Sequence, residues 1–358
     1  MFAEIKGKIE AGERLSRDDA LYLFQSDRIH EIGELADKVS RRVNGDRVYF
    51  ILNRHINPTN ICVNRCRFCA FSRSKGDRDA YEMTIDDILE DVRKAKQELG
   101  RLSEVHIVSG LHPDWNFDYY LEILSSIKSE FPEIGIKAFT AVEIDYFSRK
   151  SGLSEEEVML RLKEAGLDIM PGGGAEIFES SVRNQICPEK ISGERWLKIA
   201  KTAHTLGIKT NATMLYGHVE SYEDRVDHLF RLRELQDQTG GFLAFIPLSY
   251  QPENTDIKVP YPSGIDDLKT IAISRLVLDN IPHIKAYWIM LGEKLAQLAL
   301  LFGADCLEGT VIEERIAHSA GARSKRGMGI SEIVHLVRET GKIPVERDSF
   351  YNSLRIYG

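Results

Sequence analysis

Three of the five cysteines in the chain lie within one short segment. Cys62, Cys66 and Cys69 form a C-x3-C-x2-C run directly after a strand-like stretch. Cysteine thiolates hold iron–sulfur clusters in proteins, and a four-iron cluster normally takes four of them. Three cysteines therefore predict a [4Fe-4S] cluster in which one iron has no protein ligand. An open iron can bind a small molecule, which makes the segment a candidate for catalysis as well as electron transfer.

A zinc site or a simple electron carrier fits the spacing of the cysteine run less well. Zinc requires a fourth Cys or His at local spacing, and His55 lies seven residues upstream on the expected strand. A ferredoxin-like electron carrier normally supplies four cysteines for each cluster. Unrelated free thiols are the remaining alternative. Cys187 and Cys306, far from the run and from each other, are expected to be small buried residues.

Bulk properties limit the classes of protein that the chain can represent. Its 358 residues suffice for one large α/β barrel or two medium domains. The net charge of −8 is spread without long single-sign runs, so we expect neither a nucleic-acid partner nor a membrane surface. A short basic cluster is expected to be a solvated loop: Arg323, Lys325 and Arg326.

Cysteine use and hydropathy predict a compartment. Five cysteines cannot all pair as disulfides, and a chain of this length does not need them for stability. We find no apolar leader-like segment at the N-terminus and no run long enough to span a bilayer. We therefore expect a cytoplasmic protein in a reducing environment.

Helical and β-rich segments alternate along most of the chain. Residues 1 to about 45 are expected to be helical, and Ser16 with Asp19 resembles a capping box. Thr84, Ser154 and Ser192 are expected to begin helices that end near Gly100, Gly166 and Gly207. Eight strands are expected near residues 48–56, 104–109, 135–141, 167–170, 208–215, 241–247, 283–288 and, most weakly, 304–308.

This alternation predicts an α/β fold with parallel strands. Eight strands favour a (β/α)8 TIM-type barrel, and the alternative is an open six-strand barrel with a C-terminal cap. No linker-like composition appears, so we expect a helical N-terminal extension (1–45) and one barrel domain with C-terminal closing elements (46–358). In such barrels the chemistry gathers at the C-terminal ends of the strands. The cysteine run follows the first strand and would lie there.

The cysteine run, with Phe68 before its third cysteine, resembles the radical S-adenosylmethionine (SAM) superfamily. Further stretches are similar to the branch that holds the futalosine-route enzymes of menaquinone biosynthesis and the deazaflavin synthases: residues 53–57 (NRHIN), 106–113 (HIVSGLHP), 137–144 (KAFTAVEI) and 170–176 (MPGGGAE). Three others look most like the aminofutalosine synthases: residues 212–220 (ATMLYGHVE), 241–248 (GFLAFIPL) and 285–288 (KAYW). Asp305-Cys306 is a departure, because two acidic residues are expected there.

The resemblance implies a radical SAM transferase that consumes SAM as a co-substrate. The SAM-derived 5′-deoxyadenosyl group would add to the vinyl bond of 3-[(1-carboxyvinyl)oxy]benzoate, and 6-amino-6-deoxyfutalosine would result. The alternatives within the branch are the cyclic dehypoxanthine futalosine synthase and the deazaflavin synthase subunit that uses tyrosine. From another class, a non-catalytic iron–sulfur electron carrier stays open. An electron donor such as flavodoxin or ferredoxin is implied as a partner.

The resemblance also implies residues that bind SAM. Phe68 would pack near the adenine, Ser109 and Gly110 would offer backbone groups to the methionine amino group, and Glu143, at the end of the third strand, would accept from ribose hydroxyls. Four residues match a loose G-x-I-x-G-x-x-E pattern that backs the adenine: Thr213, Leu215, Gly217 and Glu220. Thr213 departs from the first glycine. Each of these residues also has a plain structural alternative, such as a core aromatic or an ordinary turn.

The mouth of the barrel needs donors for the two carboxylates of the implied co-substrate. Arg183 could make a bidentate pair with one of them, although an Arg on the surface is the common case. Three more residues are expected at strand ends: His112, His218 and Trp288. The triple glycine at 172–174 is too irregular for a dinucleotide fingerprint and is interpreted as a loop that lies close under a ligand.

Overall fold

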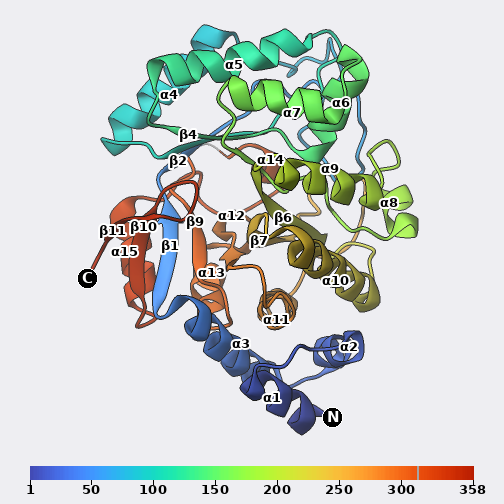
Figure 1. The fold of residues 1–358 in the computed structure, drawn as a ribbon, viewed down its shortest axis with the longest axis vertical. Coiled ribbons are helices and arrows are strands. Elements are labelled where there is room, and N and C mark those ends of the chain that lie inside the picture. The colour runs from blue at the N-terminus through green and yellow to red at the C-terminus, as the bar shows by residue number, and fades with distance from the viewer. Residues whose placement is uncertain (313) are drawn as a thin grey trace.

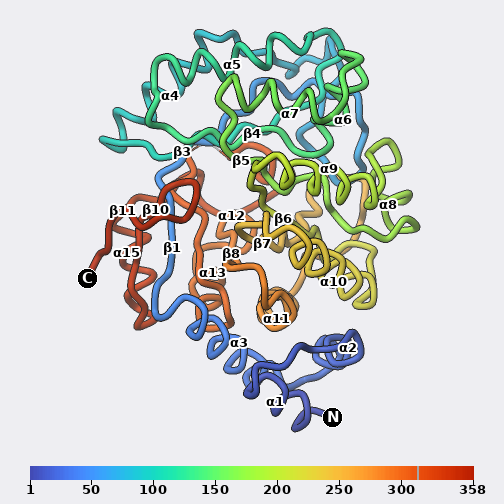
Figure 2. The backbone as a smooth tube through the Cα atoms, in the orientation of Figure 1, coloured from blue at the N-terminus to red at the C-terminus, as the bar shows by residue number. Residues whose placement is uncertain are grey.

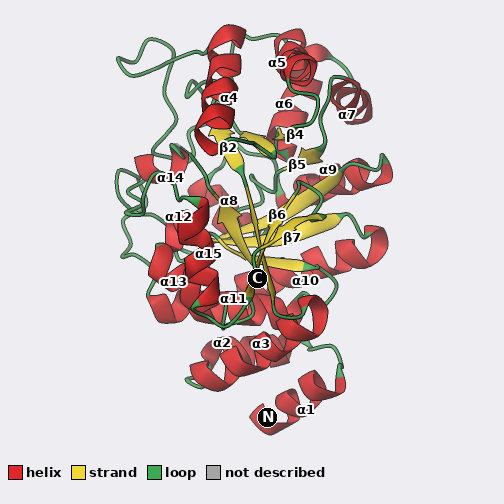
Figure 3. Cartoon of the chain, turned by 90° about the vertical axis from the view of Figure 1, so that its left-hand side faces the viewer, coloured by secondary structure: helices red, strands yellow, loops and turns green. Residues whose placement is uncertain are grey.

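The computed structural model describes residues 1–312 and 314–358. The strands are β1 (Arg47–Ile51), β2 (Asn53–Ile56), β3 (Glu104–Ile107), β4 (Gly135–Ala138), β5 (Ile169–Met170), β6 (Lys209–Tyr216), β7 (Phe242–Ser249), β8 (His283–Ala286), β9 (Cys306–Gly309), β10 (Ile343–Arg347) and β11 (Ser353–Ile356). Strands fill the interior and helices surround them, as Figure 3 shows. This layering is that of an α/β barrel.

The helices follow the strands along most of the chain. They are α1 (Phe2–Ala11), α2 (Arg17–Gln25), α3 (Ile29–Asn44), α4 (Ile85–Leu99), α5 (Phe117–Glu130), α6 (Ala141–Ser151), α7 (Glu155–Glu164), α8 (Ser180–Ile186), α9 (Gly193–Thr205), α10 (Tyr222–Thr239), α11 (Gly264–Val277), α12 (Trp288–Leu291), α13 (Glu293–Ala299), α14 (Ile316–Ser319) and α15 (Ile330–Arg338). None of the helices in the described ranges is long and apolar enough to cross a membrane.

A curled parallel sheet forms the barrel, and its two ends meet at an interrupted strand. β1 and β2 flank Leu52; β1 pairs with β9, whereas β2 pairs with β3. Between them the order runs β9-β8-β7-β6-β5-β4-β3, and every neighbouring pair is parallel. Arg54 in β2 also bridges to Ile312 just after β9. The predicted TIM-type α/β fold is confirmed, including its weakest strand at 304–308.

Capping side chains fix where the helices around the barrel begin. Thr84 and Ser154 each form a full capping box, with Asp87 and Glu157 respectively, and Ser192 accepts from the backbone of α9. Gly100 ends α4 in the left-handed conformation that favours glycine. The predicted ends at 166 and 207 lie slightly too far along, because α7 stops at Glu164 and α9 at Thr205.

Helices α1–α3 lie together at one end of the molecule, beneath α11 (Figure 1). Ser16 and Asp19 form the predicted capping box at the start of α2. Lys269 of α11 ties the two parts together, because its Nζ donates to the carbonyls of Phe24 and Ser26 at 2.9 and 2.7 Å. The division of the chain at about residue 45 stays a prediction.

Two strands at the C-terminal end were not expected from the sequence. β10 pairs in parallel with β1 on the side away from β9, and β11 pairs antiparallel with β10. In Figure 2 the blue segment of β1 lies between the orange and red C-terminal segments. The sheet therefore continues outside the barrel.

Candidate active site

A cavity of about 300 Å³ opens at the C-terminal ends of the barrel strands. Segments that follow successive strands line it: the cysteine loop after β2, Ser109 and Gly110 after β3, Thr140 and Glu143 after β4, and the glycine loop 172–174 after β5. This cavity therefore lies where the chemistry is expected in this fold.

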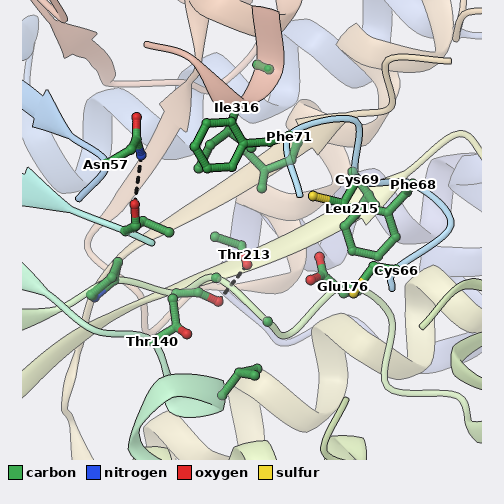
Figure 4. A pocket seen from close by; sticks show the side chains of 18 of the residues that line it. Asn57, Cys66, Phe68, Cys69, Phe71, Thr140, Glu176, Thr213, Leu215 and Ile316 are labelled. Atoms are coloured by element: carbon green, nitrogen blue, oxygen red, sulfur yellow. Dashed lines mark hydrogen bonds between the residues drawn. The ribbon is translucent and has the colours of Figure 1, made fainter. Parts of the chain in front are cut away.

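All three clustered cysteines line one side of this cavity. Cys66 is buried, and Cys62 and Cys69 are half-buried. Figure 4 shows Cys66 and Cys69 beside Phe68, Leu215 and Glu176, while Asn57 lies at the opposite side. Cys187 and Cys306 are buried and do not line the cavity. The cavity is thus lined by three thiols, the donor set that a cluster with one open iron requires.

Burial disfavours free thiolates at Cys62 and Cys66. Burial raises the pKa of the Cys66 thiol to about 12, and it also raises the pKa of Cys62. The charge of Lys190 acts in the opposite direction on both thiols. Thiols with raised pKa values are poor nucleophiles, whereas bound metal displaces their protons. The residues present therefore fit an iron–sulfur cluster.

Lys190 and Glu176 form a buried ion pair beside the cysteine loop that the sequence did not single out as a site. Lys190 Nζ lies 2.6 Å from Glu176 Oε1 and 4.9 Å from the centre of the Phe68 ring. The Lys190 charge lowers the pKa of the Glu176 carboxyl against the effect of burial. Glu176 is the last residue of the stretch 170–176 that resembles the family, whereas Lys190 lies in no recognised motif.

Two glycine positions bring backbone close to the cavity. A Cβ on Gly110 would lie 2.2 Å from the Ile61 carbonyl oxygen, and one on Gly172 would lie 2.8 Å from the backbone of residues 211 and 212. Thr213 Oγ1 donates to the Gly172 carbonyl at 2.7 Å, a bond drawn in Figure 4. Thr213, the departure from the family pattern, therefore holds the glycine loop against β6.

Glu143 lines the cavity, as expected, but its predicted place at the end of a strand is wrong. Strand β4 stops at Ala138, and Glu143 lies in the first turn of α6, where it forms a capping box with Thr140. Its Oε2 accepts from the Thr140 amide at 2.7 Å, while its buried Oε1 has no partner among the described residues. Burial raises the pKa of the Glu143 carboxyl to about 7. One acceptor thus remains for a ligand.

We expect Glu143→Gln to weaken SAM binding about tenfold to hundredfold, because a charge-assisted hydrogen bond contributes about 1.5–3 kcal/mol. Ligand donors favour the ionised carboxyl, so wild-type affinity should rise as the pH rises through about 7. The amide variant should lack that step. Calorimetric titration of SAM at several pH values measures both effects. If Glu143→Gln folds and its dissociation constant for SAM is unchanged, Glu143 only caps helix α6 and does not bind SAM.

Several predicted site residues have other roles in the structure. Gly217 and Glu220 do not line the cavity, and Glu220 accepts from the Gly217 and His218 amides and pairs with Arg225. Leu215, Thr213, Phe68, Ser109 and Gly110 do line it. Of the four residues that match the loose SAM pattern, only the first two, Thr213 and Leu215, line the cavity.

None of the four residues predicted to bind the co-substrate lines the cavity. Arg183 is buried and donates to backbone carbonyls, including those of Ala175 and Ile177 at 2.6 and 3.0 Å. The remaining three are also held by internal bonds: His112 accepts from two following amides, His218 contacts the Leu215 carbonyl, and Trp288 donates to the Gly309 carbonyl. The predicted basic loop is confirmed as exposed at Arg323 and Lys325, which form surface ion pairs.

Five chemistry-bearing residues at another part of the cavity were missed: His55, His106, Lys137, Lys285 and Glu308. They lie within strands β2, β3, β4, β8 and β9. Four of them belong to the sequence stretches that resemble the family. The type of a polar residue in a short strand does not indicate whether its side chain faces the inside or the outside of the barrel. Alternation around each position could have indicated an inward side chain.

Comparison with known proteins agrees with this geometry. Residues 56–232 match the Radical SAM superfamily, and residues 239–357 match the CofH/MqnC C-terminal region. An aminodeoxyfutalosine synthase of Thermus thermophilus is 45% identical over 99% of this chain and 96% of its own. The chain belongs to the radical SAM superfamily. A 5-amino-6-(D-ribitylamino)uracil–L-tyrosine 4-hydroxyphenyl transferase of Methanococcoides burtonii is 41% identical over 98% of this chain and 99% of its own.

A solved structure supports the fold of this radical SAM protein. Methylornithine synthase superposes with a TM-score of 0.77 at 18% identity, and the match covers 95% of this chain and 97% of the other. Membership in the superfamily implies a [4Fe-4S] cluster, SAM and a small-molecule substrate. The predicted family is confirmed.

Proposed function

We infer that the protein is an aminodeoxyfutalosine synthase, a radical SAM transferase. The observation that carries this inference is 45% identity to such an enzyme across nearly the whole of both chains. The SAM-derived 5′-deoxyadenosyl group, freed with release of methionine, adds to the vinyl bond of 3-[(1-carboxyvinyl)oxy]benzoate. The adduct rearranges onto the aromatic ring and loses its carboxyl carbon, which gives 6-amino-6-deoxyfutalosine. A second relative with the same printed activity, from Streptomyces coelicolor, is 44% identical over 99% of this chain.

Cys62, Cys66 and Cys69 are the proposed ligands of the cluster. When bound, the cluster supplies the electron that cleaves SAM. Phe68, Ser109, Gly110, Glu143, Thr213 and Leu215 line the cavity beside the cysteines and are proposed to hold SAM. Gly217 and Glu220 would not contact SAM; the hydrogen bond from the Gly217 amide to the Glu220 carboxylate would hold the loop after β6 in place. A cytoplasmic flavodoxin or ferredoxin is the proposed class of electron donor.

The cavity suits a reaction that must exclude water. Val142, Leu215, Ile246, Leu248 and Ile316 supply apolar surface around the polar groups. An enclosed site strengthens hydrogen bonds to the ligands and protects a reactive species from solvent. The chain's own contribution is therefore to position SAM and the co-substrate and to keep the site dry.

A second candidate activity is the tyrosine-dependent transferase of the deazaflavin branch, which 41% identity over 98% of the chain supports. The cyclic dehypoxanthine futalosine synthase is the third, and the match to the CofH/MqnC region is common to this group. The similarity to enzymes covers nearly the whole chain, and it argues against a non-catalytic electron carrier. The synthase differs from the other two enzymes in the fate of the adenosyl carbon, and those two differ from each other in the substrate that they consume.

We expect SAM labelled in its adenosyl group to yield a labelled nucleoside that carries the benzoate ring, in step with methionine release. Addition to a double bond leaves the adenosyl carbon bonded to the product, whereas hydrogen abstraction ends in free 5′-deoxyadenosine. Anaerobic incubation of the reduced protein with 3-[(1-carboxyvinyl)oxy]benzoate, read by mass spectrometry, measures this.

Parallel incubations with dehypoxanthine futalosine, and with tyrosine plus 5-amino-6-(D-ribitylamino)uracil, are the matched comparisons. If most of the label appears in 5′-deoxyadenosine and one of these substrates is consumed instead, the synthase assignment is wrong. The fold and the superfamily would be unaffected by that result.

A further inference from the structure

The cavity extends from the cysteine loop to a set of polar side chains inside the barrel, of which His106 is half-buried and the rest are buried. We call this set the inner cluster: His55, His106, Lys137, Lys285 and Glu308. Neighbouring strands bring its members together, since His55 pairs with His106 and His106 with Lys137 in the sheet register. So many ionisable groups inside a barrel are costly to bury unless they are paired or bind a ligand.

Each lysine of the inner cluster is paired with a carboxylate, one of which, Glu104, lies outside the cluster. Lys137 Nζ lies 2.5 Å from Glu104 Oε1, and Lys285 Nζ lies 2.5 Å from Glu308 Oε2. The other oxygen of Glu308 accepts from Asn53 Nδ2 at 3.1 Å. Two lysines and two glutamates thus balance. An incoming carboxylate would add a negative charge for which no free lysine remains among these residues.

The two histidines form a pair with spare hydrogen-bonding capacity. His106 Nδ1 lies 3.3 Å from His55 Nε2, and the ring centres are 4.5 Å apart. The outer nitrogen, His106 Nε2, is buried without a hydrogen-bond partner in the described part of the chain. A buried imidazole nitrogen without a partner is unfavourable, so a ligand atom there would restore a lost hydrogen bond.

The protonation of this pair can respond to a ligand. Burial lowers the pKa of both imidazoles, and the ionisable groups that act on them are Lys137, Lys285, Glu104, Glu308 and Glu314. The free protein therefore holds the pair uncharged at neutral pH. A carboxylate in contact with the pair would favour its charged form.

A metal ion is a poorer occupant of this place. His55, His106 and Glu308 offer ligand atoms within 4.8 Å of one another. However, Glu308 is already bonded to Lys285 and Asn53, and Lys137 Nζ lies only 3.8 Å from it. A cation would have to displace these bonds, whereas His106 Nε2 can take a ligand atom without displacing any bond among the described residues.

Resting on the proposed function, we propose that the inner cluster binds the benzoate carboxylate of the co-substrate at His106 Nε2, with uptake of one proton by the His55–His106 pair. In 3-[(1-carboxyvinyl)oxy]benzoate this carboxylate and the vinyl ether are attached to different ring carbons, meta to each other. A carboxylate held inside the barrel directs the vinyl group toward the cysteine loop and SAM. His55 and His106 are thus positioning residues for the addition.

The test is calorimetric titration of 3-[(1-carboxyvinyl)oxy]benzoate into the anaerobic, SAM-loaded protein in buffers of different ionisation enthalpy. At neutral pH we expect uptake of about one proton per site, and affinity that falls as the pH rises. The analogue in which an amide replaces the benzoate carboxylate keeps only the vinyl carboxylate, and it should bind about tenfold to hundredfold more weakly and take up no proton.

The variant His106→Gln keeps a donor of similar size but cannot be protonated. It should lose the proton uptake and raise KM about tenfold or more, while iron content and SAM cleavage by chemical reductant stay near wild type. His335→Gln, at an exposed histidine on α15, is the matched control and should behave as wild type. If His106→Gln fails to fold, the amide analogue tests the same point on the wild-type protein.

The outcomes separate this inference from the proposed function. Wild-type turnover of the benzoate without proton uptake, or equal binding of the amide analogue, overturns the inference and leaves the synthase assignment intact. Absence of both binding and turnover of the benzoate by the loaded wild-type protein overturns the assignment, and the inference falls with it.

Discussion

Alanine at Cys62, Cys66 or Cys69 is expected to abolish SAM cleavage and to leave a folded barrel. A cluster with only two protein ligands is labile, so iron should be lost along with activity. The barrel core does not depend on these thiols, because the cysteine loop lies at the cavity, outside the sheet. Iron content, the visible spectrum of the cluster and 5′-deoxyadenosine or adduct formation measure the loss, and circular dichroism measures the fold.

The matched controls for these variants are Cys187→Ala and Cys306→Ala. Both thiols are buried but lie outside the cavity, so their removal should cost some stability and little activity. Full activity in Cys66→Ala would falsify the ligand assignment. Equal loss in all five variants would show that the thiols act only through stability.

Replacing Arg183 by Met is expected to lower the free energy of unfolding by about 3 kcal/mol or more. Its guanidinium donates to the carbonyls of Ala175 and Ile177 and also to those of Gly174 and Ile191. Met fills similar space but leaves these buried acceptors without their donor. Denaturant unfolding of the variant and the wild type measures the difference.

The control is Arg161→Met, at an exposed arginine on α7, which should change stability by no more than about 0.5 kcal/mol. Arg183 was predicted from the sequence to bind a substrate carboxylate. If that were its role, Arg183→Met would raise KM strongly and leave the unfolding free energy nearly unchanged. The structure leads us to expect the reverse.

Local signals in the sequence were sufficient for the elements of the barrel. Apolar β-branched runs and capping residues such as Thr84 and Ser154 act within a few residues, so strand and helix starts could be placed. Strand β10 was missed because its pairing depends on β1, far away in the sequence, and β11 in turn pairs only with β10. No local pattern specifies such a partner.

The site was predictable where spacing is itself the signal. Three thiols at C-x3-C-x2-C offsets lie together in any compact loop, and the structure places them on one cavity. His106 and Lys137 could not be recognised in this way, because their contacts come from neighbouring strands rather than from sequence spacing. Glu143 was predicted to end strand β4 but lies in helix α6. The capping box of Glu143 with Thr140 begins the helix, so the strand is shorter than its β-rich composition indicated.

The interrupted strand β1–β2 has a consequence for the order in which the chain can fold. β1 precedes the cysteine loop but pairs with β9 and β10, which are among the last strands in the sequence. During synthesis, β3 to β8 can each pair with a strand already made, whereas β1 must wait until β9, which ends at Gly309, has been made. Bringing such distant segments together has a large loop-closure entropy and slows folding. The first-made strand of the barrel therefore stays without a partner until nearly all of the other barrel strands have been synthesised.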